Sequence, residues 1–220
     1  MHTAKPMIVA TSIWHLKRII DDLLDAEGFG ADLNHIDVRL VCDMEGLFSS
    51  SLFNGSIDRW NVENVTSMAS MFTGSQFNGD ISRWNVGNVR SMSNMFSHGQ
   101  FNGAIDQWDV LNVESMCAMF YRSPFRGDVS AWNVANVRNF DGMFADNNFS
   151  HETSRWSIAP NASIRFFVDR HVLSRFEKPT MYHWLLALED RTALQSNSIW
   201  IKHFLDVAPI ARGMTSSVME

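Results

Sequence analysis

The chain has 220 residues, 45% of them hydrophobic, which is enough to bury one extended core. Its 18 basic and 24 acidic residues give a formal net charge of −6, which argues against general binding to nucleic acid. No apolar run reaches the length of a membrane span and the first residues lack the pattern of a signal peptide, so the sequence predicts a cytoplasmic protein outside any membrane.

Residues 1–35 are expected to form a helical cap ahead of a repeating region. Within them, residues 11–27 carry apolar side chains at helical spacing, which predicts one amphipathic helix. Thr11 or Ser12 is suited to the N-cap, and Gly28 is suited to end the helix. We expect this helix to cover the first unit of the repeat.

A 24-residue repeat occupies the middle of the chain, over residues 36–172. Its degenerate first and last copies are residues 36–52 and 149–172, and the four complete copies are residues 53–76, 77–100, 101–124 and 125–148. Two aromatic columns mark it: Phe53, Phe77, Phe101, Phe125 and Phe149, and Trp60, Trp84, Trp108, Trp132 and Trp156. One unit cannot bury its apolar face alone, so the pattern predicts an α/β repeat solenoid with these columns inside.

Each copy is expected to hold one strand, around Ile81 to Val86, and one short helix, from Val89 to Phe96. The glycine of each copy is expected to take a positive φ at a turn into the strand. These glycines are Gly55, Gly79, Gly103 and Gly127. A recurring asparagine is expected to form a ladder of side-chain amides bonded to backbone groups. Its members are Asn64, Asn88, Asn112 and Asn136.

Cys42 and Cys117 are expected to be free thiols. They are three repeat units apart, and units stacked at about 4.8 Å would hold their backbones roughly 14 Å from each other. A disulfide requires Cα atoms within about 7 Å, so the sequence predicts no bond between them.

Residues 173–220 lie beyond the repeat and are expected to form a helical region with a flexible tail. Pro179 and Thr180 open one helical pattern that includes Trp184, and residues 198–207 form another that includes Trp200. These aromatic side chains exceed what one end of a stack needs for its cover, so Trp184 and Trp200 are candidate partner contacts. The alternative is an ordinary C-terminal cap.

The repeat unit FNGDISRWNVGNVRSMSNMF resembles the BspA-type leucine-rich repeat, which is also found in Mycoplasma-type lipoproteins. The resemblance spans about residues 36–168 and implies a leucine-rich-repeat-like, right-handed coil with a parallel strand ladder and helical N- and C-terminal caps. It implies a role in binding other proteins, mostly in surface or adhesion proteins, and no catalytic residues. Short cytosolic members in bacteria and phages imply an intracellular inhibitor or decoy.

The positions that vary between copies are the candidates for partner binding, because the core positions explain only the scaffold. If the outward strand residues line one face, they form a flat surface of mixed charge that suits a protein partner. This predicted face consists of Arg59, Arg83, Gln107, Arg155, Glu63 and Leu111. A patch on the helix side, formed by Arg90, Glu114 and Arg138, is the competing choice.

Motifs for catalysis, phosphate binding and metal ligation are absent from the sequence, which predicts no enzyme activity, no cofactor and no metal. The sequence therefore favours a protein-binding module, in its specific form an intracellular inhibitor or decoy of bacterial or phage origin. The first alternative is a cell-surface or adhesion repeat protein. A more distant one is an enzyme whose site lies in the C-terminal region.

Overall fold

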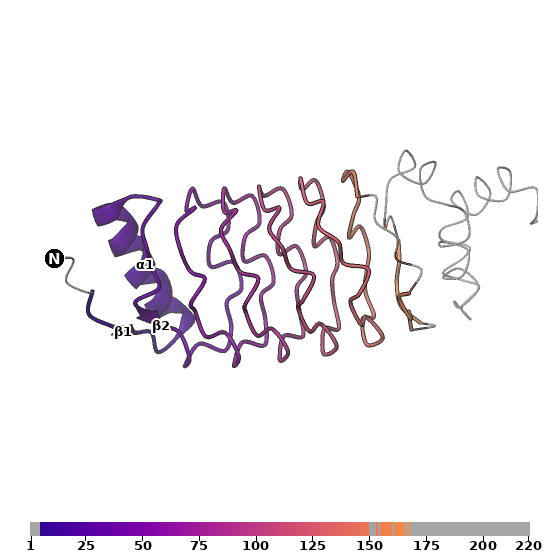
Figure 1. Cartoon of the computed structure of the whole chain (residues 1–220), viewed down its shortest axis with the longest axis horizontal. Coiled ribbons are helices and arrows are strands. Elements are labelled where there is room, and N and C mark those ends of the chain that lie inside the picture. Colours follow the sequence, from indigo (N-terminus) through magenta and orange to yellow (C-terminus); the bar gives the residue numbers. More distant parts are fainter. Residues whose placement is uncertain (1–4, 150–152, 154, 160, 166, 168–220) are drawn as a thin grey trace, which may run out of the picture.

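The computed structural model describes residues 5–149, 153, 155–159, 161–165 and 167. It contains strand β1 (Ile8–Val9), helix α1 (Ile13–Glu27) and strand β2 (Ile36–Asp37), and β1 pairs with β2 in parallel. From residue 29 the chain winds in successive 24-residue revolutions that stack along the long axis of the molecule (Figure 1). We number these revolutions coil 1 (29–52), coil 2 (53–76), coil 3 (77–100), coil 4 (101–124) and coil 5 (125–148). The helices expected after residue 179 lie outside the described residues.

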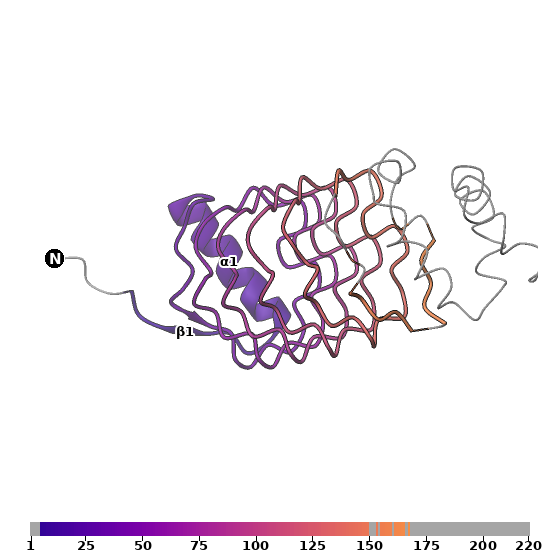
Figure 2. The same cartoon turned by 45° about the vertical axis from the view of Figure 1, so that its right-hand side comes forward.

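Helix α1 confirms the helix predicted over residues 11–27. The Ser12 hydroxyl accepts a hydrogen bond from the His15 backbone N–H at 3.2 Å, which caps the N-terminus. Gly28 ends the helix with a φ of 83° and donates its N–H to the Leu24 carbonyl. The buried face of α1, which includes Leu16 and Ile20, joins the core, and Figures 1 and 2 show the helix across the N-terminal end of the stack.

Parallel pairing joins each coil to the next through a column of short polar residues. The bridged pairs along this column are Asp43 with Ser67, Ser67 with Ser91, Ser91 with Ser115, Ser115 with Asn139, and Asn139 with Ser163. The pairing also extends upstream of residue 36, because the Phe29 carbonyl accepts the Asn54 N–H at 2.8 Å. Residues 29–35 therefore complete coil 1, of which only the second half was evident as a repeat.

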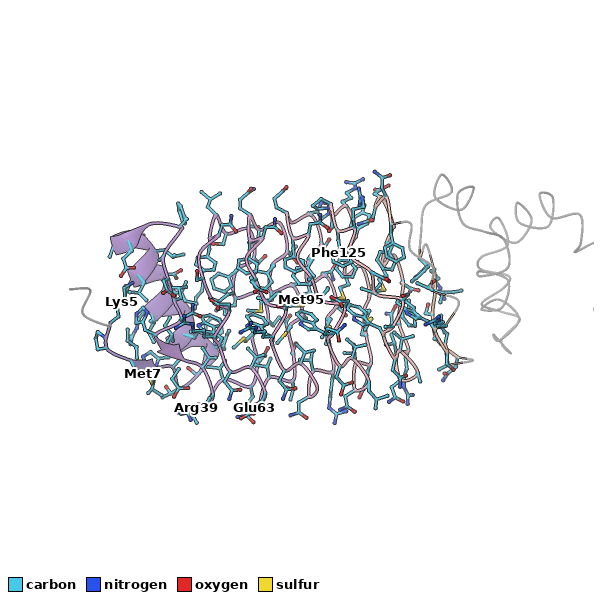
Figure 3. The ribbon with its side chains drawn as sticks, viewed as in Figure 1. Lys5, Met7, Arg39, Glu63, Met95 and Phe125 are labelled. Carbon is cyan, nitrogen blue, oxygen red and sulfur yellow. The ribbon has the colours of Figure 1, made fainter. Side chains whose placement is uncertain are left out.

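The core is a stack of aromatic and methionine columns. Two phenylalanines of neighbouring coils pack face to face, as in Phe72 and Phe77, whose ring centroids lie 4.4 Å apart. Along the axis, Phe72 and Phe96 stack at 5.7 Å, and Trp60 and Trp84 stack at 6.4 Å. Figure 3 shows Met95 and Phe125 inside the stack. All the repeated phenylalanine and tryptophan columns are buried, as the repeat predicted.

The path of the chain within a coil differs from the strand and helix that the sequence suggested. The backbone N–H of Trp84 donates to the Ile81 carbonyl, and the backbone N–H of Val89 donates to the Val86 carbonyl. The segment expected as a strand therefore consists of tight turns. The segment expected as a helix, after Ser91, also consists of consecutive turns, and it carries the bridge to the neighbouring coils. The reason is the three-residue spacing of the buried side chains, which successive tight turns satisfy and an alternating strand does not.

The expectation of a positive φ at the repeat glycines is wrong. The described glycines with positive φ are Gly28, Gly46, Gly74 and Gly142, and none of them belongs to the repeated column. The repeat glycines are required by space instead. A Cβ on Gly79 would lie 2.8 Å from Cε2 of Phe77 and 3.2 Å from the Gly55 carbonyl oxygen of the preceding coil. The stacked Phe ring and the neighbouring backbone leave no volume for a side chain.

The predicted asparagine ladder is confirmed. The side-chain amide of each ladder asparagine donates to a carbonyl of the preceding coil, at 2.7–2.9 Å. The accepting residues are Arg39, Glu63, Gly87 and Leu111. A second ladder was not foreseen: the indole N–H of every repeated tryptophan donates to a backbone carbonyl of the preceding coil, as from Trp108 to Ile81 at 3.1 Å. Both ladders satisfy polar groups that the stacking would otherwise leave unpaired.

Left-handed backbone recurs twice in each coil, in the segment that follows the bridge. The first position of coils 1 to 5 is filled by Gly46, Ser70, Asn94, Ala118 and Gly142, with φ between 51° and 65°. The second is filled by Ser50, Gly74, His98, Arg122 and Asp146, with φ between 50° and 65°. Residues with a Cβ are disfavoured in this conformation, so the non-glycine members hold strain.

Replacing Ala118 with glycine is expected to raise the free energy of unfolding by about 0.5–1 kcal/mol, because a left-handed alanine is strained and a left-handed glycine is not. Ala118 has a φ of 51°. The midpoint of urea unfolding measures the change. The matched control is Ala104→Gly, at an exposed position without a positive φ, which is expected to lower stability. Equal losses in both variants would contradict the expectation.

Candidate functional site

The predicted partner-binding residues of the arginine column lie at one position of the repeat, on coils 2, 3 and 4 and on the copy that follows coil 5. Arg59, Arg83, Gln107 and Arg155 are all exposed and lie at equivalent positions. Their contacts are local: the Arg59 guanidinium lies 4.0 Å from the Asp58 carboxylate next to it, with its side chain 81% exposed, and Gln107 donates to Asp106 at 2.6 Å. These residues form a solvated column, and in the described part of the chain no hydrogen bond or ion pair joins one of them to another.

Glu63 and Leu111 lie in a second column, which begins with Arg39. Both are exposed at the edge of the stack, and Figure 3 shows Arg39 and Glu63 on that rim. The Arg39 guanidinium bonds the Asp37 carboxylate at 2.6 Å, and this bond holds the pKa of Asp37 below its usual range. The backbone carbonyls of this column accept the hydrogen bonds from the ladder asparagines. The backbone of the column is therefore fixed, while its side chains vary from coil to coil. Trp184 and Trp200, the remaining predicted site residues, lie outside the described part of the chain.

A third surface, which the sequence reasoning missed, joins interacting side chains of three successive coils. We call it the His98–Asp146 row, and it consists of His98, Tyr121, Arg122 and Asp146. The His98 ring meets the Tyr121 ring edge-on with centroids 5.0 Å apart, and the Arg122 guanidinium lies 5.1 Å from the centroid of the same tyrosine ring. Arg122 Nε donates to Asp146 Oδ2 at 2.7 Å. The row thus links coils 3, 4 and 5 in one continuous chain of contacts.

The electrostatics of the row follow from its central ion pair. The hydrogen bond from Arg122 lowers the pKa of Asp146, and the same bond raises the pKa of Arg122. The side chains of Arg122 and Asp146 are 55% and 46% exposed, so the pair is accessible to a partner. The guanidinium of Arg122 also lies over the Tyr121 ring, so the ion pair and the aromatic ring form one surface.

The backbone beneath the row is strained. His98, Arg122 and Asp146 have φ values of 56°, 52° and 50°, at the position where coil 2 has Gly74. A non-glycine residue there loses about 1 kcal/mol relative to an unstrained conformation. Local strain of this kind is concentrated at functional positions in proteins, so three strained, interacting side chains in consecutive coils mark a candidate binding site.

The competing patch of Arg90, Glu114 and Arg138 lies at the other end of the same bridging segment. Arg90 Nη1 bonds Glu114 Oε1 at 2.8 Å, and the side chains are 67% and 52% exposed. An exposed pair of this kind contributes little to stability. The patch has no aromatic member and no left-handed residue, so the His98–Asp146 row is the stronger candidate.

Comparison with known protein families assigns most of the described chain to one family. The family model described as "Mycoplasma protein of unknown function, DUF285" matches residues 18–123 and, in a second segment, residues 97–168. The two segments together cover more than half of the sequence. The chain belongs to the DUF285 family. No curated protein and no solved structure matches it.

The DUF285 match includes every described coil, and its two segments overlap over residues that include His98, Tyr121 and Arg122. The sequence did contain a signal for the row: the column Gly74, His98, Arg122 and Asp146 changes chemistry at every copy. Gly74 in this column is the residue that indicates a left-handed backbone conformation. Variation alone does not distinguish this column from the other variable positions of the repeat, which include the arginine column.

Other site chemistry in the described DUF285 chain is limited. Cys42 and Cys117 are both free, as predicted. Burial raises the pKa of the Cys117 thiol, which disfavours its reactive thiolate. Among the described residues, no group of three or more His, Cys, Asp or Glu side chains is arranged to hold a metal ion. The helix in that part of the chain is too short and too polar to cross a membrane.

Proposed function

We propose that this DUF285 chain is a protein-interaction module that binds a protein partner through the His98–Asp146 row. One observation carries the proposal: three of the four row residues stand on left-handed backbone where glycine would be unstrained. Stability alone favours glycine at those positions. Ser70 and Ala118 also have left-handed backbone, and what distinguishes the row residues is that their side chains join Tyr121 in a continuous set of contacts across three coils.

The chemistry of the row suits a protein surface better than a small ligand or a nucleic acid. Tyrosine and arginine are the side chains that most often dominate protein interfaces, and Tyr121 and Arg122 are adjacent here. The ion pair of Arg122 with Asp146 presents both signs of charge at one place. The net charge of −6 further disfavours a phosphate backbone as the partner.

The proposal includes a fold assignment and a mode of action. We assign the stacked coils to the BspA-type leucine-rich-repeat class of right-handed solenoids, supported by the repeat motif and the parallel pairing of equivalent residues. We further propose that the chain acts in the cytoplasm as an inhibitor or decoy, without catalysis of its own. Two features support this mode of action. The repeated residues are used in the buried core, and the side chains of the His98–Asp146 row are already held in place on the surface by their mutual contacts, which lowers the entropic cost of binding.

The test compares the full chain with a double variant, His98→Gly plus Arg122→Gly. Both substitutions remove a row side chain and place glycine at a positive φ, so the urea unfolding midpoint is expected to hold or rise. Binding is expected to weaken at least about 30-fold, the loss of roughly 2 kcal/mol that one interface hot spot supplies. Affinity capture from cells that express the chain identifies the partner, and calorimetry on the purified pair measures the affinity.

The matched control is the triple variant Arg59→Glu, Arg83→Glu and Arg155→Glu, which reverses the charge of the predicted arginine column. It is expected to bind the partner with unchanged affinity. A row variant that folds and binds like the unmodified chain would reject the row as the site. Loss of binding in the arginine-column variant alone would move the site to that column.

A further inference from the structure

The exposed large apolar side chains are concentrated at the N-terminal end of the molecule. Of the seven such residues in the described part of the chain, six precede coil 2. These six are Met7, Val9, Trp14, Phe29, Leu40 and Leu52. Trp14, on helix α1, is the most exposed at 82%, and Figure 3 shows Met7 at the same end of the stack. Exposed apolar residues that gather in one region indicate an interaction surface.

Trp14 is the first of four exposed residues that follow the outer face of α1. The others are Arg18, Asp22 and Ala26, and the four lie at intervals of four residues. This spacing places them on one side of the helix, away from the buried Leu16. Figure 1 shows α1 at the N-terminal end of the stack, with the coils on one side of it only. We call these four residues the α1 outer line.

The two charged residues of the α1 outer line have no ionic partner in the described part of the chain. Lys17 and Asp21, on the neighbouring side of the helix, form an ion pair at 2.8 Å across one turn. Arg18 and Asp22 have the same four-residue spacing, yet neither forms an ion pair with any described residue. Two opposite charges therefore lie next to each other in solvent, and each is available to a charge on another molecule.

The order of residues along the α1 outer line makes it complementary to itself. A two-fold axis that passes between Arg18 and Asp22 pairs Arg18 with Asp22 of a second copy, and Asp22 with Arg18 of that copy. The same axis places the large Trp14 side chain opposite the small Ala26 of the second copy. The two helices are antiparallel in this arrangement, so their dipoles also attract each other. We propose that the chain forms a two-fold symmetric dimer through the outer face of α1.

The charges of α1 favour a second copy over other occupants of this face. Asp21, Asp22 and Asp25 are all exposed, which disfavours an anionic membrane as the surface that covers Trp14. A purely basic segment of another protein would pair with Asp22 and bring like charge to Arg18. A second copy satisfies both residues at once. This face is separate from the His98–Asp146 row, so either proposal can fail alone.

The test is sedimentation of the full chain over a range of concentrations. One helix face is a small contact, so the dimer is expected to be weak, with a dissociation constant of about 10 µM. At about 100 µM the mean mass is expected to approach twice the monomer mass of 25.1 kDa, and at about 1 µM the chain is expected to be mainly monomeric. Trp14→Ala is expected to raise the dissociation constant about tenfold.

Charge reversal separates the proposed pairing from other modes of association. Arg18→Asp and Asp22→Arg each bring like charges together across the axis, and each alone is expected to raise the dissociation constant at least about tenfold. An equimolar mixture of the two variants is expected to recover the dimer, because opposite charges again meet at both positions. Arg59→Asp makes the same charge change on coil 2 and is expected to leave the dissociation constant within about twofold.

A full chain that stays monomeric at about 100 µM would contradict the proposal. So would single variants that associate as tightly as the unmodified chain, because the dimer would then use another surface. A mixture that associates no better than either variant alone would reject the pairing of Arg18 with Asp22. Circular dichroism checks that each variant is folded, which these exposed substitutions are expected to preserve.

Discussion

Replacing Trp108 with alanine is expected to lower the free energy of unfolding by about 3–5 kcal/mol. Trp108 is 4% exposed at the centre of the stack, and its indole N–H donates to the Ile81 carbonyl at 3.1 Å. Alanine opens a cavity between the tryptophans of the neighbouring coils and removes one of the two donors to that carbonyl, which keeps only the Trp84 backbone N–H. Each described coil contributes one side chain to this column, so the column has no further member that replaces the lost ring. Urea unfolding followed by circular dichroism measures the loss.

The matched control is Trp14→Ala, which deletes the same side chain from the exposed face of α1. Trp14 is 82% exposed, so its loss is expected to change stability by less than about 0.5 kcal/mol. Trp108→Phe separates the two contributions at the buried site, because it keeps an aromatic ring and removes the donor. A loss in Trp108→Ala no larger than in Trp14→Ala would contradict the role assigned to the tryptophan column.

Replacing Gly55 with alanine is expected to lower the free energy of unfolding by about 3 kcal/mol, through overpacking. The added Cβ would lie 2.0 Å from the Ala31 carbonyl oxygen and 2.8 Å from Cε2 of Phe53. Neither neighbour can withdraw freely, because the carbonyl belongs to the backbone of coil 1 and the ring is packed within the phenylalanine stack. Coils 1 and 2 must separate locally, which weakens the pairing between them.

Gly30→Ala is the control for this prediction, since a Cβ at Gly30 meets no atom within 4 Å. Neither glycine has a positive φ, so the pair isolates the effect of space from that of backbone conformation. Thermal or urea unfolding of the two variants gives the comparison. Similar stability of both variants would show that the coils can part around a methyl group, and would refute the steric account of the repeat glycine.

Much of the interior could be predicted from the sequence. The constant spacing of Phe101 and Trp108 with their equivalents requires the same environment in every coil, so their burial followed directly from recurrence. The asparagine ladder followed for the same reason, because an amide conserved between apolar positions must bond backbone in each copy. Neither inference required knowledge of the path of the chain within a coil.

The candidate site could not be predicted in the same way. Arg59 was placed correctly on an exposed column, yet the presumed strand beneath it is a tight turn, and the bridging segment lies near Ser67. Apolar residues three apart are compatible with a helical turn and with consecutive tight turns, and only the inter-coil hydrogen bonds distinguish the two. His98 and Arg122 were consequently overlooked.

The sequence by itself determined the period of the stack, the side chains inside it and the freedom of Cys42 and Cys117, because these depend only on which residues recur and how far apart they lie. The tertiary structure decided the left-handed backbone under the His98–Asp146 row and the direction of the hydrogen bonds between successive coils. Both depend on backbone dihedral angles and on pairing between coils. Residues as different as Gly74, His98 and Arg122 share one such conformation, so residue type alone does not reveal it.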